Sequence, residues 1–235
     1  MAFRIEARTG AILIWAAFAA SGQTFAVRHE HMGKDGPGEL KISDTGISFT
    51  ETGKKAKPKH SRTWKYEQIQ QLELSPDRLR ILTYEDVRLS GRDREYVFVD
   101  LPAGFAKAAY PQWRDKLDRR FIAALPDSEV RTLVEFPAKL GGTFKGMEGM
   151  LRFGEDRIVF ETARAGESRT WRFSDIDNIA SAGPFDFSLT TLEHHGVWNA
   201  GTREFRFQLR KPMEEARFDE LWRKLFRQPL TESRP

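Results

Sequence analysis

A segment that occurs twice constrains the fold of this chain more than any other feature. Residues 62–66 read Arg-Thr-Trp-Lys-Tyr, and residues 169–173 read Arg-Thr-Trp-Arg-Phe, an offset of 107 residues (169 minus 62). Further matches on both sides pair Gly38 with Gly149, Leu40 with Leu151, Ile47 with Ile158, Phe49 with Phe160, Ile69 with Ile176, Thr83 with Thr191, Glu85 with Glu193, Arg94 with Arg203, Phe98 with Phe207 and Trp113 with Trp222. A unit of this length is a whole domain, because solenoid repeats span only about 20–50 residues. The sequence therefore predicts two related modules in tandem.

Length and composition fit two such modules. The chain has 235 residues, of which 40% are hydrophobic and 31% charged, which suits two cores of about 100 residues each. Its net charge of +4 arises from interspersed acids and bases, so nucleic-acid binding is not predicted. The absence of cysteine excludes disulfides, cysteine-zinc sites and thiol chemistry.

Residues 1–22 have the layout of a signal peptide. Arg4 and Arg8 precede an uncharged run over residues 9–20, which is followed by small residues. The run is too short for a membrane span, which needs about 20 apolar residues. We therefore predict a secreted or periplasmic protein whose mature chain starts between Ala20 and Val27. The alternatives are an N-terminal helix packed on the first module and an uncleaved membrane anchor.

Periodicity within the first module predicts short strands. Alternating or apolar runs place them at residues 25–31, 39–43, 46–51, 63–66, 69–74, 79–84 and 95–101. Seven short strands of this kind are typical of a small sandwich or a partly open barrel.

A helix is predicted to end each module. In the second, Pro212 suits the first helical position, and one apolar face carries Phe218, Leu221, Trp222 and Leu225. In the first, Pro111 opens the predicted helix, and its apolar face carries Trp113, Leu117 and Phe121. We expect each helix to bury its tryptophan, Trp113 or Trp222, against its own sheet.

Core-type residues recur at matching places in both modules. They are Gly38, Glu39, Leu40, Gly46, Ile47, Phe49, Trp64, Tyr66, Glu67 and Ile69 in the first, and Gly149, Leu151, Ile158, Phe160, Trp171, Phe173, Asp175 and Ile176 in the second. On these residues the modules resemble the pleckstrin-homology (PH) superfamily, especially its GRAM-like and bacterial members. The resemblance implies two tandem seven-stranded barrels or sandwiches, each capped by a C-terminal amphipathic helix, over residues 23–126 and 127–235, with a short tail from about residue 228. A lipocalin-like barrel is the rival, but it needs eight strands around a ligand cavity.

The most distinctive polar feature is a basic loop in the first module. Lys54, Lys55, Lys57 and Lys59 lie within residues 53–62 without any acid, and such a cluster can hold phosphate. The resemblance implies that this loop lies at the open end of the barrel, near the loop that carries Arg92, where phosphoinositide-binding PH domains gather basic residues. Residues 163–167 of the second module lack the cluster. The alternative is a solvated loop without a ligand.

Other candidate groups are weaker. His29, His31 and His60 could supply three imidazoles to a metal, and His194 and His195 are adjacent, but no carboxylate has a recognisable metal spacing with either set. We therefore predict polar strand or loop histidines, no metal and no cofactor.

Two acids and one tryptophan also need an interpretation. Glu85 and Glu193 recur without a paired carboxylate, which predicts contacts at strand ends rather than catalysis. Trp198, in a loop of the second module, is a candidate for partner recognition if it is exposed.

These features favour a non-enzymatic, exported binding or scaffold module that recognises a protein or peptide. Peripheral binding to an anionic membrane through the basic loop is the second hypothesis, and an enzyme is the third. A groove between the last strands and the helix would favour the first, a converged basic pocket the second, and a cleft with perturbed acids or histidines the third.

Overall fold

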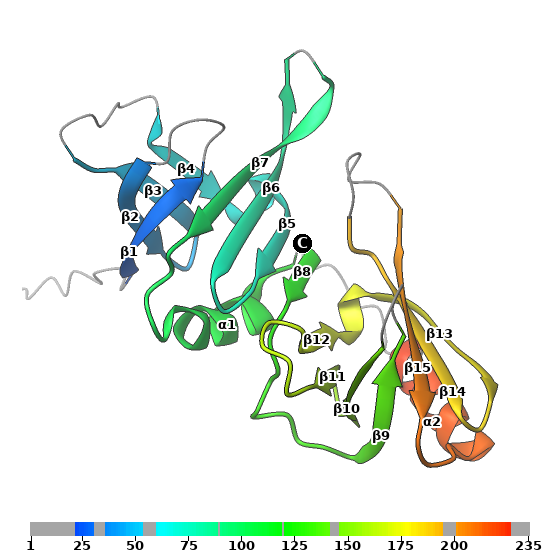
Figure 1. The fold of residues 1–235 in the computed structure, drawn as a ribbon. Coiled ribbons are helices and arrows are strands. Elements are labelled where there is room, and N and C mark those ends of the chain that lie inside the picture. Colours follow the sequence, from blue (N-terminus) through cyan, green and yellow to red (C-terminus); the bar gives the residue numbers. More distant parts are fainter. Residues whose placement is uncertain are drawn as a thin grey trace, which may run out of the picture.

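The computed structural model describes residues 22–30, 36–53, 60–88, 90–118, 120–141, 146–194 and 201–226 (Figure 1). We call residues 22–118 the N-terminal half, residues 120–133 the linker and residues 134–226 the C-terminal half. The N-terminal half contains β1 (Gln23–Glu30), β2 (Gly36–Ile42), β3 (Gly46–Glu51), β4 (Arg62–Lys65), β5 (Ile69–Leu74), β6 (Arg78–Val87), β7 (Arg92–Val99) and α1 (Phe105–Lys116). The linker contains β8 (Arg120–Ala123). The C-terminal half contains β9 (Val134–Leu140), β10 (Met147–Phe153), β11 (Arg157–Glu161), β12 (Arg169–Arg172), β13 (Ile176–Gly183), β14 (Asp186–Thr191), β15 (Arg203–Leu209) and α2 (Glu215–Phe226).

The described strands form one continuous sheet with a repeated order. The N-terminal half contributes the order β5-β6-β7-β1-β2-β3-β4, and the C-terminal half contributes the matching order β13-β14-β15-β9-β10-β11-β12. Strand β8 lies between them, where it pairs in parallel with β5 and meets β12 through Ala123 and Thr170. The expected mainly β chain with two helices is confirmed.

The two halves have separate cores built from matching aromatic residues. The ring of Trp64 meets that of Tyr96 edge-on at 4.7 Å, and the ring of Trp171 meets that of Phe205 at 4.8 Å. Such edge-to-face contacts add to the stabilisation from buried apolar area. The repeated residues are therefore mainly core residues.

The glycine that is repeated as Gly38 and Gly149 is required for a steric reason. A Cβ atom at Gly38 would clash with the ring of Phe49, and one at Gly149 would clash with the ring of Phe160. Each glycine thus lets a core phenylalanine lie across the neighbouring strand.

The predicted helix of the first module is wrong at both ends. Helix α1 begins at Phe105, after Gly104 in the left-handed region (φ +87°), so Pro111 lies inside it and does not open it. It ends at Lys116, and Phe121 belongs to β8, where it pairs with Leu72. The ring of Phe121 still packs near that of Trp113, at 6.2 Å, because the strand carries it into the same core. In the second module, α2 begins at Glu215, after Pro212.

The expected burial of Trp222 is also wrong. Trp113 is fully buried, whereas Trp222 is 42% exposed. Burial follows the same spacing in both helical regions, through Phe105, Trp113 and Leu117 in one and Met213, Leu221 and Leu225 in the other. Trp113 therefore corresponds to Leu221. Since successive helical residues differ by about 100° around the axis, Trp222 is turned out of the core.

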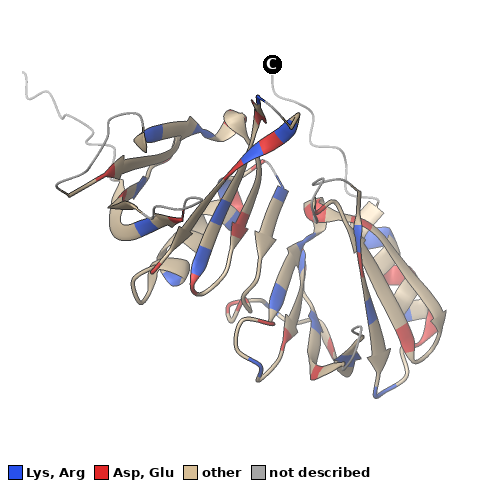
Figure 2. Cartoon of the chain, turned by 45° about the horizontal axis from the view of Figure 1, so that its top comes forward, with Lys and Arg blue, Asp and Glu red and all other residues tan. Residues whose placement is uncertain are grey.

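No helix among these described segments is long and apolar enough to cross a membrane. Figure 2 shows Lys and Arg interspersed with Asp and Glu on the strands of both halves.

Candidate functional site

The predicted anion-binding residues fall mainly outside the described residues. This holds for Lys54, Lys55, Lys57 and Lys59, and also for Trp198. Arg92 is described: it begins β7 in the β6–β7 hairpin, and its side chain is exposed. The anion site and recognition by Trp198 stay predictions.

The described histidines lie in three different settings. His29 packs among the core rings of Phe49, Tyr96 and Phe98, with ring centroids 5.2–5.9 Å apart. The Nδ1 atom of His60 lies 3.0 Å from Glu51 Oε2. Within the described segments, no three His, Cys, Asp or Glu residues are grouped to hold a metal. His31 and His195 lie outside the described residues.

His194 links the two halves through its backbone. Its N–H donates to Gln71 Oε1 at 2.7 Å, and Gln71 Nε2 donates to the His194 carbonyl at 3.0 Å. The amide of the buried Gln71 thereby joins β5 to the segment that follows β14.

The repeated glutamates make the strand-end contacts predicted for them. Glu85 pairs with Arg94 at 3.8 Å, and Glu193 pairs with Arg203 at 3.4 Å. A buried threonine lies next to each pair. The hydroxyl of Thr83 donates to the Arg94 carbonyl, and the hydroxyl of Thr191 donates to the Arg203 carbonyl.

The two glutamates differ in burial. Glu85 is exposed, whereas Glu193 is buried close to Arg169. Burial raises the pKa of Glu193, and the charges of Arg169 and Arg203 oppose this shift. Burial lowers the pKa of Arg169, whose Nη1 atom has no hydrogen-bond partner among the described residues. Arg169 lies in β12, which pairs with β8, whereas its counterpart Arg62 lies in β4, the last described strand of the sheet.

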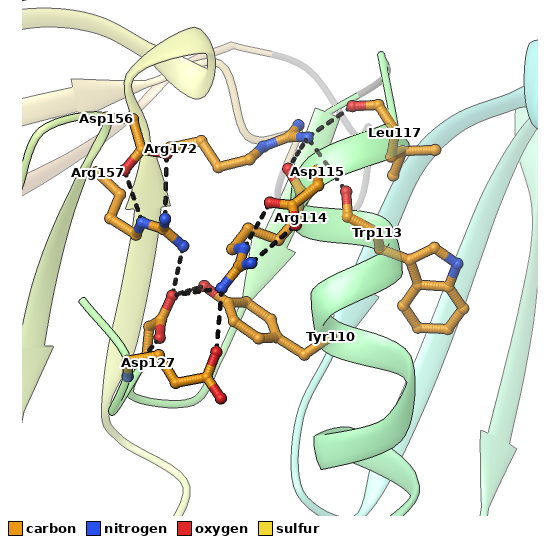
Figure 3. A network of polar contacts seen from close by, with 10 residues as sticks. Tyr110, Trp113, Arg114, Asp115, Leu117, Asp127, Asp156, Arg157 and Arg172 are labelled. Carbon is orange, nitrogen blue, oxygen red and sulfur yellow. Dashed lines mark hydrogen bonds and ion pairs between the residues drawn. The ribbon is translucent and has the colours of Figure 1, made fainter. Parts of the chain in front are cut away.

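A polar network joins the two halves around Asp127 (Figure 3). Tyr110 of α1 donates from its hydroxyl to Asp127 Oδ2 at 2.8 Å, and Arg157 of β11 donates to the same atom at 2.6 Å. Arg114 of α1 reaches it at 3.5 Å. The Asp127 side chain is only 2% exposed, so one carboxylate connects the helix of one half to the sheet of the other.

These contacts lower the pKa of Asp127 and raise the pKa of Tyr110. Burial alone would raise the pKa of Asp127, but the hydrogen bonds from Tyr110 and from the Glu129 N–H, together with Arg157 and Arg114, hold it below its usual range. Burial and the bond to Asp127 raise the pKa of Tyr110. The network is thus an ion pair whose hydrogen bonds are satisfied, as a buried charge requires.

A second polar contact closes the junction at the end of α1. Arg172 donates from Nη1 to the Leu117 carbonyl at 2.6 Å (Figure 3). Its Nε atom also donates to Asp175 Oδ2 at 2.6 Å. Asp175 accepts the N–H of Phe121 at 3.2 Å. The carbonyl end of α1 is therefore capped by a residue of the other half.

The linker also lies along strand β12 as an extended segment. The Thr170 hydroxyl donates to the Leu125 carbonyl at 2.9 Å and accepts the N–H of Asp127 at 3.0 Å. Around this contact, Ile122, Ala124 and Val159 are buried. The outer face of β11 and β12 thus holds a short peptide that ends in a carboxylate.

No described segment covers the corresponding outer face of the N-terminal half. It contains a hollow of about 270 Å³ lined by Lys41, Ser43, Thr45, Gly46, Ile47, Ser48, Thr63, Trp64 and Lys65. Thr63 corresponds to Thr170, and it is exposed. Gly46 stands where the other half has Arg157, so no side chain fills the space.

The junction residues were missed because a repeat pattern does not show which residues contact the other half. Arg157, Arg172 and Asp175 correspond to Gly46, Lys65 and Gln68. A search for positions at which the copies differ in charge would have found Arg157 and Asp175, whereas Arg172 is matched by another cation, Lys65. Asp127 and Tyr110 carry no such signal.

An exposed aromatic pair lies on α2. The rings of Trp222 and Phe226 are 5.1 Å apart, and the side chains are 42% and 39% exposed. With the helices aligned by burial, Trp222 stands at the position of Arg114, whose side chain in α1 binds Asp127 of the linker.

Comparison with protein-family models and with curated proteins gave no match. Among solved structures, the chain is similar to the C-terminal domain of an unknown protein from Leishmania infantum, with 12% identity, a TM-score of 0.31 and coverage of 41% of this chain and 83% of that one. It is also similar to the Spt16D Pob3N heterodimer, with 13% identity, a TM-score of 0.32 and coverage of 83% of this chain and 99% of that one.

Proposed function

We propose that this chain is an exported, non-enzymatic binding or scaffold protein, built from two PH-like domains, that recognises a protein or peptide partner. The repeated strand order and the two aromatic cores support the two-domain interpretation. The repeated acids Glu85 and Glu193 are each engaged with an arginine at a strand end, which supports a structural role for them.

The observation that carries the binding proposal is the exposed pair of Trp222 and Phe226. Aromatic side chains are enriched at the centres of protein interfaces because they bury a large area with few rotatable bonds. The same helix face in α1 already contacts another part of the protein through Arg114. We therefore expect α2 to dock a protein partner through its aromatic pair.

Peptide display on the full chain tests this proposal. Selected ligands should bind the wild type, and they should bind the double variant Trp222→Arg/Phe226→Arg at least about tenfold more weakly. The reason is that a central aromatic contact contributes at least about 1.4 kcal/mol. Tyr84→Arg, which changes another exposed aromatic residue, is the matched control and should bind normally. Ligands that bind all three proteins equally would reject α2 as the recognition surface.

Membrane binding through Lys54, Lys55, Lys57 and Lys59 remains the alternative function. Its support is the charge of the sequence in residues 53–62.

A further inference from the structure

The C-terminal half supplies a template for peptide recognition within this protein. Residues 123–127 lie along β12, where Ala123 pairs with Thr170 and the Thr170 hydroxyl contacts the backbone at Leu125 and Asp127. The carboxylate of Asp127 then binds Arg157. Backbone contacts at a strand edge thus combine with one ion pair, as in recognition by strand addition.

The N-terminal half keeps part of this framework, and no described segment lies where the linker lies in the C-terminal half. Strand β4 is the terminal strand of the described sheet, so one of its edges has no neighbouring described strand. Thr63 is retained at the position of Thr170 and is exposed beside the hollow of about 270 Å³. An edge of this kind is a template for another extended chain.

The charges that line the hollow favour an acidic ligand. Lys41 and Lys65 flank it, at the positions of Arg152 and Arg172, and its lining as described includes no carboxylate. Two acids lie nearby: Glu67, 3.7 Å from the Lys65 ammonium, and Asp44, paired with Lys116 at 2.8 Å. The Lys65–Glu67 pair is exposed, so Glu67 competes only weakly with a ligand for Lys65. Asp44 is paired with Lys116, outside the lining.

Gly46 makes room for such a ligand. A Cβ atom at Gly46 would clash with the Trp64 carbonyl, so this part of the lining has no side chain, whereas the matching position of the other half carries Arg157. At the next outward-facing position, the N-terminal half has Ser48 where the C-terminal half has the buried Val159. A polar residue there suits a ligand that binds reversibly from water.

We propose that this hollow, with the edge of β4, binds an extended peptide segment that carries an Asp or Glu side chain. The backbone of the peptide pairs with β4 near Thr63, and its carboxylate lies between Lys41 and Lys65. This inference extends the proposed binding function to a second surface and names its ligand. Because its test leaves α2 unchanged, either surface can fail alone.

A labelled peptide with the sequence of residues 121–128, Phe-Ile-Ala-Ala-Leu-Pro-Asp-Ser, is the probe. Fluorescence anisotropy with the full chain should show saturable binding, and the same peptide with Asn in place of Asp should bind about tenfold more weakly, because it loses the ion pairs. The double variant Lys41→Glu/Lys65→Glu should bind the Asp peptide at least about tenfold more weakly than the wild type does. Lys107→Glu/Lys211→Glu changes the net charge equally at exposed sites and should bind as the wild type does.

Amide hydrogen exchange separates strand addition from simple charge attraction. The bound peptide should slow exchange at Thr63 or Lys65, whereas blocked single aspartate should bind far more weakly and protect neither. No saturable binding, equal binding of the Asp and Asn peptides, or equal binding by the two lysine double variants would overturn the proposal. Equal affinity for blocked aspartate would also overturn it, because the backbone contacts would then contribute nothing.

Discussion

Tyr110 donates a 2.8 Å hydrogen bond to Asp127 and so ties helix α1 to the linker. Arg157 binds the same carboxylate oxygen from β11, and both partners are largely screened from water. The junction between the halves therefore includes this buried charge, together with the Arg172–Asp175 contact and the pairing of β8 with β5 and β12.

Removal of that charge should loosen the junction. Asp127→Asn leaves Arg157 and Arg114 without their shared counter-ion, so we expect a loss of about 3 kcal/mol in the free energy of unfolding. Tyr110→Phe removes one hydrogen bond and should cost about 1 kcal/mol. Asp115→Asn removes an exposed partner of Arg114 and should change stability by less than about 0.5 kcal/mol. Urea unfolding measures all three, and equal losses for Asp127→Asn and Asp115→Asn would contradict the buried-charge account.

The acid dependence of stability should have opposite signs at Asp127 and Glu193. The pKa of Asp127 is lowered in the folded state, so its contribution is present above the unfolded pKa of about 3.9 and is lost as pH falls through the folded value. The pKa of Glu193 is raised, so its ionisation costs stability as pH rises above about 4.3 through the folded value.

Unfolding measured from pH 3 to pH 7 tests both signs. The stability of the wild type relative to Asp127→Asn should increase with pH, whereas its stability relative to Glu193→Gln should decrease. Parallel slopes for the two comparisons would contradict the opposite shifts.

The sequence was most informative where the two copies agree. The shared Trp64 and Trp171 mark matching cores, and the predicted strand ranges lie close to β1–β7. It was misleading where a single residue had two possible environments. Phe121 and Trp222 both fit an amphipathic helix. The helix end at Lys116 instead places the buried Phe121 in β8, and a one-residue offset in alignment turns Trp222 out of the core. Both outcomes depend on tertiary packing.

The candidate site could be predicted only in part for a related reason. Contacts such as Tyr110 with Asp127 join separate elements, and no local pattern records them. Charge differences between the copies, such as Gly46 against Arg157, do mark where one half meets the other. Differences between repeats can therefore locate an interface that the shared residues do not reveal.

The two helical tryptophans should respond differently to truncation. Trp113→Ala removes a fully buried side chain and the hydrogen bond from its Nε1 to Tyr66, so a loss of about 3–5 kcal/mol is expected. Trp222→Ala removes an exposed side chain and should cost less than about 1 kcal/mol. Chemical denaturation of the two variants gives the comparison, and similar losses would show that Trp222 is buried in solution.

The basic loop allows a test of the membrane hypothesis that is independent of the fold. If Lys54, Lys55, Lys57 and Lys59 bind an anionic surface, each contributes up to about 1 kcal/mol, so their joint replacement by Gln should abolish sedimentation with phosphatidylglycerol vesicles. Replacement of Lys107, Lys116, Lys211 and Lys224 by Gln removes the same total charge elsewhere and should leave most of the binding. Tm should change little in the loop variant, because like charges in a solvated loop stabilise few native contacts. Since charges at a membrane surface are strongly screened at about 0.5 M salt, binding that persists there, or that both variants lose equally, would exclude the loop as the cause and favour protein recognition.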